Sequence, residues 1–237
     1  MNILEQLMVR ATDDPSVRGV ILTGSHARGL ATEHSDYDVT VVIDEPRPPS
    51  GESPRSGEPW ERERGSTLDL VALTTEQLAD TSVLWQRYAY RGARVLLDRG
   101  GIGRLVERQA TPTDDEAREW AREYLDGYVN QLYRAVKSRR DGHPGAALLD
   151  EQESVGWLLA TVFALHGRVR PYNKYLGWEL TTYPLPGVWN ELLAVDNIAH
   201  HPVELFPAVE HLARANGHGD LLDGWGTDIE LIRAAAR

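Results

Sequence analysis

The stretches TGSHARG (residues 23–29) and SDYD (35–38) decide the fold of the first half of the chain. Residues 17–22 (VRGVIL) form a β-branched run that predicts a buried strand, which ends at the glycine of the first stretch. A short helix is expected to follow. The N–H groups and the dipole at the start of a helix attract anions, and glycine lets a phosphate approach the backbone. The turn at Gly24 and Ser25 therefore predicts a phosphate site.

Three carboxylates follow this turn in the sequence. Asp36 and Asp38 are spaced i, i+2 at the start of a strand predicted over 37–43 (YDVTVVI), so they share one face. Asp69 lies inside an apolar strand predicted over 67–73 (TLDLVAL), where a charge is costly unless it is paired or binds a metal. Oxygen ligands of this kind suit Mg²⁺, and three of them beside a phosphate turn predict a two-metal phosphoryl-transfer site. The alternatives are a turn or helix cap for the first two and a solvent-facing strand edge for the third.

The rest of the first half follows the same alternation of helices and strands. Residues 3–13 have helical spacing, and a Thr-x-x-Gln capping box at 74–77 starts another helix. A fourth strand is predicted at 93–97. Residues 44–66 are rich in Pro, Gly, Ser and charge, which predicts a mobile loop with a functional role. A hairpin extension without a function is the alternative.

The second half of the chain has a helical period throughout. A Thr-x-x-Glu signature at 113–116 starts a helix over 114–140, and a second long helix is predicted over 146–167. Shorter helices are expected near 188–195, 202–215 and 220–235. The sequence therefore predicts two domains, an α/β domain at 1–110 and an all-helical domain at 111–237.

The composition excludes several classes of protein. The chain has 237 residues, no cysteine and a net charge of −11, so disulfides and cysteine-based zinc sites are ruled out. No basic footprint for duplex nucleic acid is present. The N-terminus lacks the pattern of a signal peptide, and no apolar run reaches the roughly 18 residues that span a bilayer, so a cytoplasmic protein without a membrane partner is expected. The acidic charge suits a cationic small substrate, although solubility alone explains it as well.

The glycine–serine turn, the Asp36-x-Asp38 pair after ten intervening residues and the strand residue Asp69 resemble the signature of DNA-polymerase-β-like nucleotidyltransferases. The segment RPYNKYL at 170–176 resembles the helical domain of small bacterial members related to aminoglycoside nucleotidyltransferases. The resemblance is close over residues 20–73 and loose elsewhere. It implies an α+β fold with a mixed β-sheet and flanking helices, followed by a helical bundle. It also implies an NTP donor, two Mg²⁺ ions and transfer of a nucleoside monophosphate to a hydroxyl.

The resemblance also implies roles for single residues of the first domain. Gly24 and Ser25 would hold the triphosphate. Asp36 and Asp38 would ligate both metal ions. Asp69 would ligate the catalytic metal and accept the proton of the acceptor hydroxyl.

Two cationic residues are implied to meet the nucleotide. Arg28 is placed to contact a phosphate, and a salt bridge to Glu33 or Asp36 is its alternative role. Lys174 would reach the nucleotide phosphates from the second domain, and a solvated loop lysine is the alternative.

A carboxylate of the second domain is a further candidate for the catalytic base. Asp150, Glu151 and Glu153 cluster near the start of the second long helix, where the helix dipole alone favours acidic residues. Glu153 lies off the apolar stripe. We therefore select it as a candidate general base for the acceptor hydroxyl, or as a ligand for a cationic amine.

These observations lead to one preferred function and two alternatives. The preferred function is transfer of AMP from ATP, or of another NMP, to a small hydroxylated and cationic acceptor such as an aminoglycoside. The first alternative is transfer to a protein or tRNA, as in toxin–antitoxin systems, although the acidic charge disfavours nucleic acid. The second is a nucleotide-binding regulatory module without turnover. The sequence does not identify the acceptor or the oligomeric state.

Overall fold

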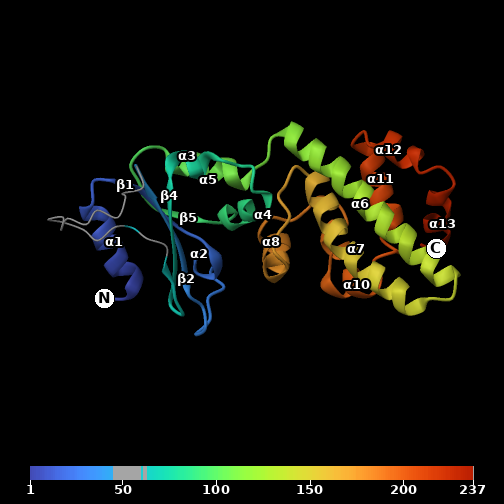
Figure 1. Cartoon of the computed structure of the whole chain (residues 1–237), viewed down its shortest axis with the longest axis horizontal. Coiled ribbons are helices and arrows are strands. Elements are labelled where there is room, and N and C mark those ends of the chain that lie inside the picture. Colours follow the sequence, from blue (N-terminus) through green and yellow to red (C-terminus); the bar gives the residue numbers. More distant parts are fainter. Residues whose placement is uncertain (45–59, 61–62, 237) are drawn as a thin grey trace, which may run out of the picture. The chain divides into compact units, whose positions relative to one another are not determined.

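The computed structural model describes residues 1–44, 60 and 63–236. The chain divides into two compact units, Met1–Thr111 and Pro112–Arg237. The first unit contains a β-sheet with helices, and the second is helical (Figure 1).

Among the described residues, five strands form one sheet in the order β3-β4-β2-β1-β5. β2 and β4 are parallel, whereas the other neighbouring strands are antiparallel. The mixed sheet followed by a helical region confirms the expected α+β class. The strands are β1 (Val17–Leu22), β2 (Tyr37–Ile43), β3 (Glu63–Arg64), β4 (Leu68–Thr74) and β5 (Arg94–Asp98).

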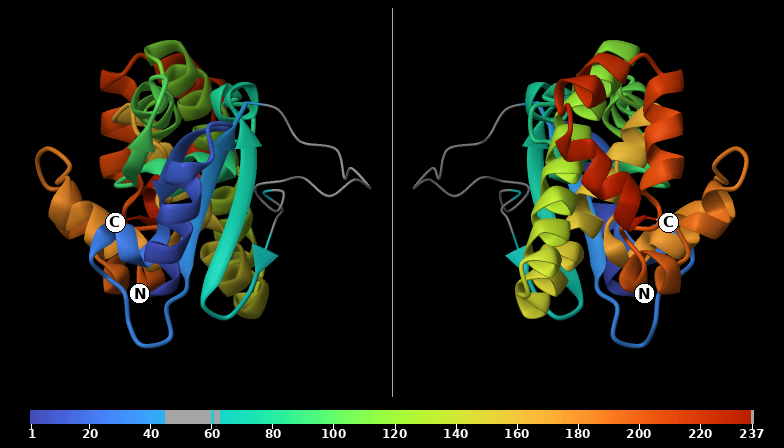
Figure 2. Two further views of the ribbon diagram at one scale, coloured as in Figure 1. Left: turned by 90° about the vertical axis from the view of Figure 1, so that its left-hand side faces the viewer. Right: turned by 90° about the vertical axis from the view of Figure 1, so that its right-hand side faces the viewer.

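Helices cover both faces of the sheet. On one face lies α1 (Ile3–Asp13) (Figure 2). Its Leu7 packs in a buried cluster with Val41 and Leu70. On the other face, Leu78 of α3 and Ile102 of α5 belong to a cluster with strand residues of β1 and β2. Alternate residues of each strand thus face different helices. The remaining helices of this unit have the bounds α2 (Gly24–Arg28), α3 (Thr75–Ala79), α4 (Leu84–Arg87), η1 (Tyr88–Tyr90, a 3₁₀ helix) and α5 (Ile102–Ala110).

The loop predicted over 44–66 falls mostly on residues 45–59 and 61–62, which lie outside the described part of the chain. Near the end of this range the loop prediction is wrong. Residues Glu63–Arg64 form strand β3, which pairs with β4. A charged segment can form such an edge strand because the pairing uses backbone groups, and charged side chains are common on sheet edges. The indole Nε1 of Trp60 donates a hydrogen bond to Asp14 Oδ2 at 3.0 Å, so this position is fixed beside the end of α1.

The carboxylate of Asp98 organises the turn between β5 and α5. It accepts four backbone N–H groups at 2.8–3.1 Å, from Gly100, Gly101, Ile102 and Gly103. The hydrogen bond from Gly103 contributes most, and together the four lower the pKa of Asp98 from 3.8 to about 2. The carboxylate therefore stabilises the folded state in its charged form.

Replacing Asp98 by asparagine should make the free energy of unfolding less dependent on pH below about pH 4. A depressed pKa adds stability that is complete above pH 3.8 and is lost as the pH falls toward 2. At neutral pH we expect Asp98→Asn to be less stable by about 1 kcal/mol, the usual cost of a lost helix cap. Urea denaturation of both proteins between pH 2 and pH 7 measures the difference, which should shrink below pH 4. A constant difference over this range would contradict the assignment.

The second unit is built on a hairpin of two long helices, α6 (Asp114–Arg140) and α7 (Pro144–Leu165). The predicted capping box is present, because Thr113 Oγ1 accepts the N–H of Glu116. Gly127 lets the helices approach closely, since a methyl group built on it would lie 2.6 Å from the ring of Trp157. The other elements are η2 (Asn173–Tyr175), α8 (Leu176–Thr182), α9 (Trp189–Leu192), α10 (Val195–His200), α11 (Phe206–Ala215), α12 (Gly219–Gly224) and α13 (Asp228–Ala235). No helix of the described residues is both long and apolar enough to cross a membrane.

Candidate functional site

Asp38 and Asp69 lie directly opposite each other on adjacent strands. The parallel pairing of β2 with β4 aligns Asp38 with Asp69, and the N–H of Tyr37 donates to the carbonyl of Thr67 at 3.0 Å to fix the start of the pairing. Neighbouring strands are about 4.8 Å apart, and aligned residues point to the same face. The sheet therefore places two of the three predicted carboxylates side by side.

The environment of Asp69 leaves one of its oxygens unsatisfied. The side chain is 23% exposed, and Oδ2 lies 3.8 Å from Nε of Arg64 on β3. Oδ1 is buried and has no hydrogen-bond partner. A buried carboxylate oxygen without a partner is costly, and a bound cation would remove this cost.

Gly24 packs directly against Asp38. Its φ is +65°, in the region that favours glycine, and a methyl group built on it would lie 1.7 Å from Asp38 Oδ2. The N–H of Thr23 donates to the carbonyl of Asp38 at 2.9 Å. The first residue of α2, and with it the predicted phosphate turn, is therefore held next to the carboxylate. Ser25 follows it in α2 and is buried.

Asp36 is held at the entrance to β2 by contacts of its two neighbours. The His26 ring stacks on the ring of Tyr37 with centroids 3.9 Å apart. His26 Nε2 also lies 3.2 Å from the carbonyl oxygen of Ser35. These contacts join α2 to the residues before and after Asp36, whose side chain is half-buried.

Arg28 makes contacts within the first unit that the sequence does not predict. The side chain is buried and donates hydrogen bonds to four backbone carbonyls, those of Gly24, Tyr88, Ala89 and Arg91, at 2.6–3.1 Å. No ion pair of Arg28 with Glu33 or Asp36 is observed among the described residues. The guanidinium instead connects the turn of α2 to η1, because its several donors match a cluster of carbonyl acceptors. We therefore interpret Arg28 as part of the scaffold of the turn, and its predicted contact with a phosphate stays a prediction.

Replacing Arg28 by methionine should destabilise the protein by about 3 kcal/mol, since it leaves buried carbonyl groups without donors. Urea denaturation measures this loss, and Arg28→Lys should restore part of it because lysine has fewer fixed donors. The control is Arg18→Met, which removes an exposed arginine paired with Asp44 and should change stability by less than about 0.5 kcal/mol. If Arg28 contacted a phosphate instead, its loss would weaken nucleotide binding at unchanged stability.

The two site residues predicted in the second unit are both exposed. Glu153 on α7 accepts a hydrogen bond from Nε2 of Gln131 at 2.9 Å. Its neighbours Asp150 and Glu151 form ion pairs with arginines of α6. Lys174 lies in η2, with its Nζ 5.4 Å from the ring centroid of Tyr175. The roles of Glu153 as a base and of Lys174 as a phosphate ligand stay predictions.

The carboxylates of the first unit provide some of the ligands that a divalent cation needs. Within the described residues, no group of three or more His, Asp or Glu side chains is arranged to hold a metal ion. Asp38 and Asp69 nevertheless supply paired oxygen donors, and the unsatisfied Oδ1 of Asp69 is the group that a cation would complete. The donors are all oxygen, which suits Mg²⁺ better than softer metals.

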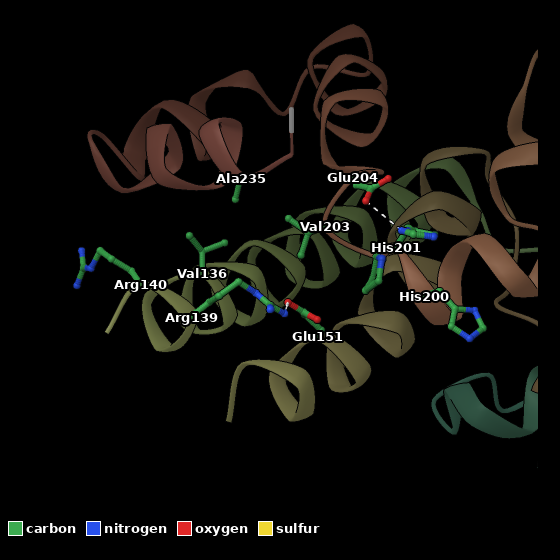
Figure 3. Close-up of a pocket in the computed structure, with 10 residues that line it drawn as sticks. Val136, Arg139, Arg140, Glu151, His200, His201, Val203, Glu204 and Ala235 are labelled. Carbon is green, nitrogen blue, oxygen red and sulfur yellow. Dashed lines mark hydrogen bonds and ion pairs between the residues drawn. The ribbon is translucent and has the colours of Figure 1, made fainter. Parts of the chain in front are cut away.

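A separate pocket of about 430 Å³ lies in the second unit (Figure 3). Arg139 pairs with Glu151 in its wall, and His201 Nδ1 lies 3.0 Å from Glu204 Oε1. Arg139 and Glu151 therefore neutralise each other. None of the predicted site residues lines this pocket, so it gives no support to the predicted chemistry.

Sequence reasoning missed two residues that contact the candidate site. Arg64 lies in the charge-rich segment that was predicted as a loop, and only the pairing of β3 with β4 places it beside Asp69. His26 stacks on Tyr37, a contact between α2 and β2 that the sequence alone does not reveal. Its position inside the GSHARG stretch was the only available signal.

A comparison with known families finds a match within the first unit. The family model described as a nucleotidyltransferase domain matches residues 5–89. The match includes the turn at Gly24 and the carboxylates Asp36, Asp38 and Asp69. No curated protein gives a significant match to the chain. Residues 5–89 of the N-terminal unit therefore match a nucleotidyltransferase domain, in agreement with the expected resemblance to the DNA-polymerase-β-like superfamily.

Proposed function

We propose that this protein transfers AMP from ATP to a hydroxyl group of a small cationic acceptor, such as an aminoglycoside, and releases pyrophosphate. The observation that supports this proposal best is the alignment of Asp38 with Asp69 beside Gly24. The net charge of −11 is a weaker argument for a cationic acceptor. Mg²⁺ is the metal that the oxygen donors favour.

The residues of the candidate site in the first unit would each have a distinct role in the reaction. Asp38 and Asp69, together with Asp36, would hold the metal ions. A bound metal would neutralise phosphate charge and lower the pKa of the acceptor hydroxyl. The turn at Gly24 and Ser25 would bind the triphosphate through backbone N–H groups, since the first N–H groups of a helix have no acceptor within the helix.

The proposed reaction is a substitution at the α-phosphorus. The acceptor hydroxyl loses its proton to Asp69, and its oxygen forms a bond to the α-phosphorus of ATP. The bond from this phosphorus to the oxygen that bridges to the β-phosphorus breaks, and pyrophosphate leaves with the electron pair. Glu153 is an alternative proton acceptor.

An acceptor screen tests this function. The protein is incubated with each labelled NTP, Mg²⁺ and a panel of aminoglycosides and neutral sugars, and pyrophosphate release is measured. Release with ATP and an aminoglycoside supports the proposal, and the Asp36→Ala/Asp38→Ala variant should show none. Label on tRNA or protein would support the macromolecular acceptor instead. Nucleotide binding without release for any acceptor would indicate a regulatory module.

A further inference from the structure

Arg64, Asp69 and Asp38 occupy neighbouring register positions on three consecutive strands. β3 pairs Arg64 with Asp69, and β2 pairs Asp38 with the same Asp69. Directly paired residues project from the same face of a sheet. One positive charge is therefore followed by two negative charges along a single row across β3, β4 and β2.

The ion pair at the end of this row is loose. Arg64 Nε lies 3.8 Å from Asp69 Oδ2, and the arginine side chain is 78% exposed. Exposed ion pairs contribute little to stability, because water screens them and the long side chain loses conformational freedom. Asp69 keeps its other oxygen without a hydrogen bond even with Arg64 in place. Arg64 thus reduces the negative charge of the site but leaves Oδ1 of Asp69 without a hydrogen bond.

We propose that Arg64 is a built-in counter-cation of Asp69, which competes with the divalent metal ion for this carboxylate. The inference rests on the proposed function, in which Asp38 and Asp69 hold the metal. A divalent ion between these carboxylates places two positive charges near the guanidinium, and like charges repel over such distances. Metal binding must therefore displace Arg64, and an exposed side chain on a two-residue edge strand can leave at low cost.

This competition has a consequence for the protein without a bound metal ion. Arg64 offsets the repulsion between neighbouring carboxylates when no metal is bound. The same charge lowers the affinity for the metal. With Arg64 in place, the metal-free protein is more stable than it would be with the two carboxylates alone. The affinity for the metal ion is correspondingly lower.

The test measures metal binding without nucleotide and without turnover. Mn²⁺ alone is titrated into the full-length protein, and its binding is followed by calorimetry and by the electron paramagnetic resonance of free Mn²⁺. Removing the charge in Arg64→Gln should lower the Mn²⁺ dissociation constant about three- to fivefold, the upper range for an exposed ion pair. Arg64→Lys keeps the charge and should bind as the wild type does. Arg18→Gln is the matched control, because it breaks an exposed pair with Asp44 outside this row and should bind Mn²⁺ as the wild type does.

A second measurement uses thermal unfolding with and without Mn²⁺. Tighter binding means that saturating Mn²⁺ raises the melting temperature of Arg64→Gln more than that of the wild type. An unchanged or weakened affinity in Arg64→Gln overturns the inference, and so does an equal gain in Arg64→Lys. In these cases the proposed function stands, provided that the wild type binds Mn²⁺ and Asp69→Asn does not. If the wild type binds no Mn²⁺, both the inference and the metal-dependent function fail.

Discussion

Replacing Asp69 by asparagine is expected to lower kcat for nucleotidyl transfer by about 10³-fold while the protein stays folded. Metal ligands contribute several kcal/mol of transition-state stabilisation, and each 1.36 kcal/mol is about tenfold in rate. Asp38→Asn should have the same effect, because the two carboxylates are aligned on β2 and β4. Single-turnover rates with the acceptor found in the screen measure the loss.

Stability should respond in the opposite direction to activity. Asp69 has a buried oxygen without a partner and faces a like charge, so its neutralisation relieves an unfavourable interaction. We expect the urea midpoint of Asp69→Asn to equal or exceed that of the wild type without metal. The control is Asp44→Asn, an exposed residue just after β2 that pairs with Arg18 and should keep full activity. Activity of Asp69→Asn within tenfold of the wild type would exclude this carboxylate from the reaction.

Replacing Gly24 by alanine should reduce activity by about 10²-fold or more. The added methyl group would lie 1.7 Å from Asp38 Oδ2, so the carboxylate and the turn cannot both keep their positions. A displacement of about 1 Å in a catalytic group is enough for a loss of this size. The positive φ of +65° adds a stability cost of about 1–2 kcal/mol.

Gly29→Ala separates the steric effect from the backbone effect. Gly29 follows α2 and has a φ of +72°, but a methyl group built on it would meet no atom within 4 Å. It should lose a similar amount of stability and keep its kcat. Steady-state kinetics and urea denaturation of both variants give the comparison. Equal activity in the two variants would show that the contact between Gly24 and Asp38 is not needed for catalysis.

The sequence predicted the backbone of the site well, because the signals for it are local. The β-branched run at 37–43 coincides with β2, and the capping box at 74–77 starts α3. The strand that carries Asp69 also forms as predicted, one residue later than expected. These elements depend on strand propensity, helix caps and alternation, which can be read within a few residues.

Contacts between distant residues were not predictable in the same way. Arg28 binds carbonyls of residues 88–91, about sixty positions away, and no spacing rule connects these segments. Arg64 acquires its neighbour only through strand pairing. In the second unit, the apolar Leu148 is 54% exposed, because Ala147 occupies the inward position of that turn. Apolar residues next to each other at the start of a helix cannot all face the core.

The in-register pairing of β2 with β4 links the assembly of the proposed catalytic centre to the folding of the sheet. A slip of one residue would turn Asp69 to the opposite face and leave Asp38 without its neighbour. A chain with every functional residue intact would then be inert. The leucines on the other face of β4, Leu68 and Leu70, oppose such a slip by their burial, so they would preserve the proposed site without taking part in its chemistry.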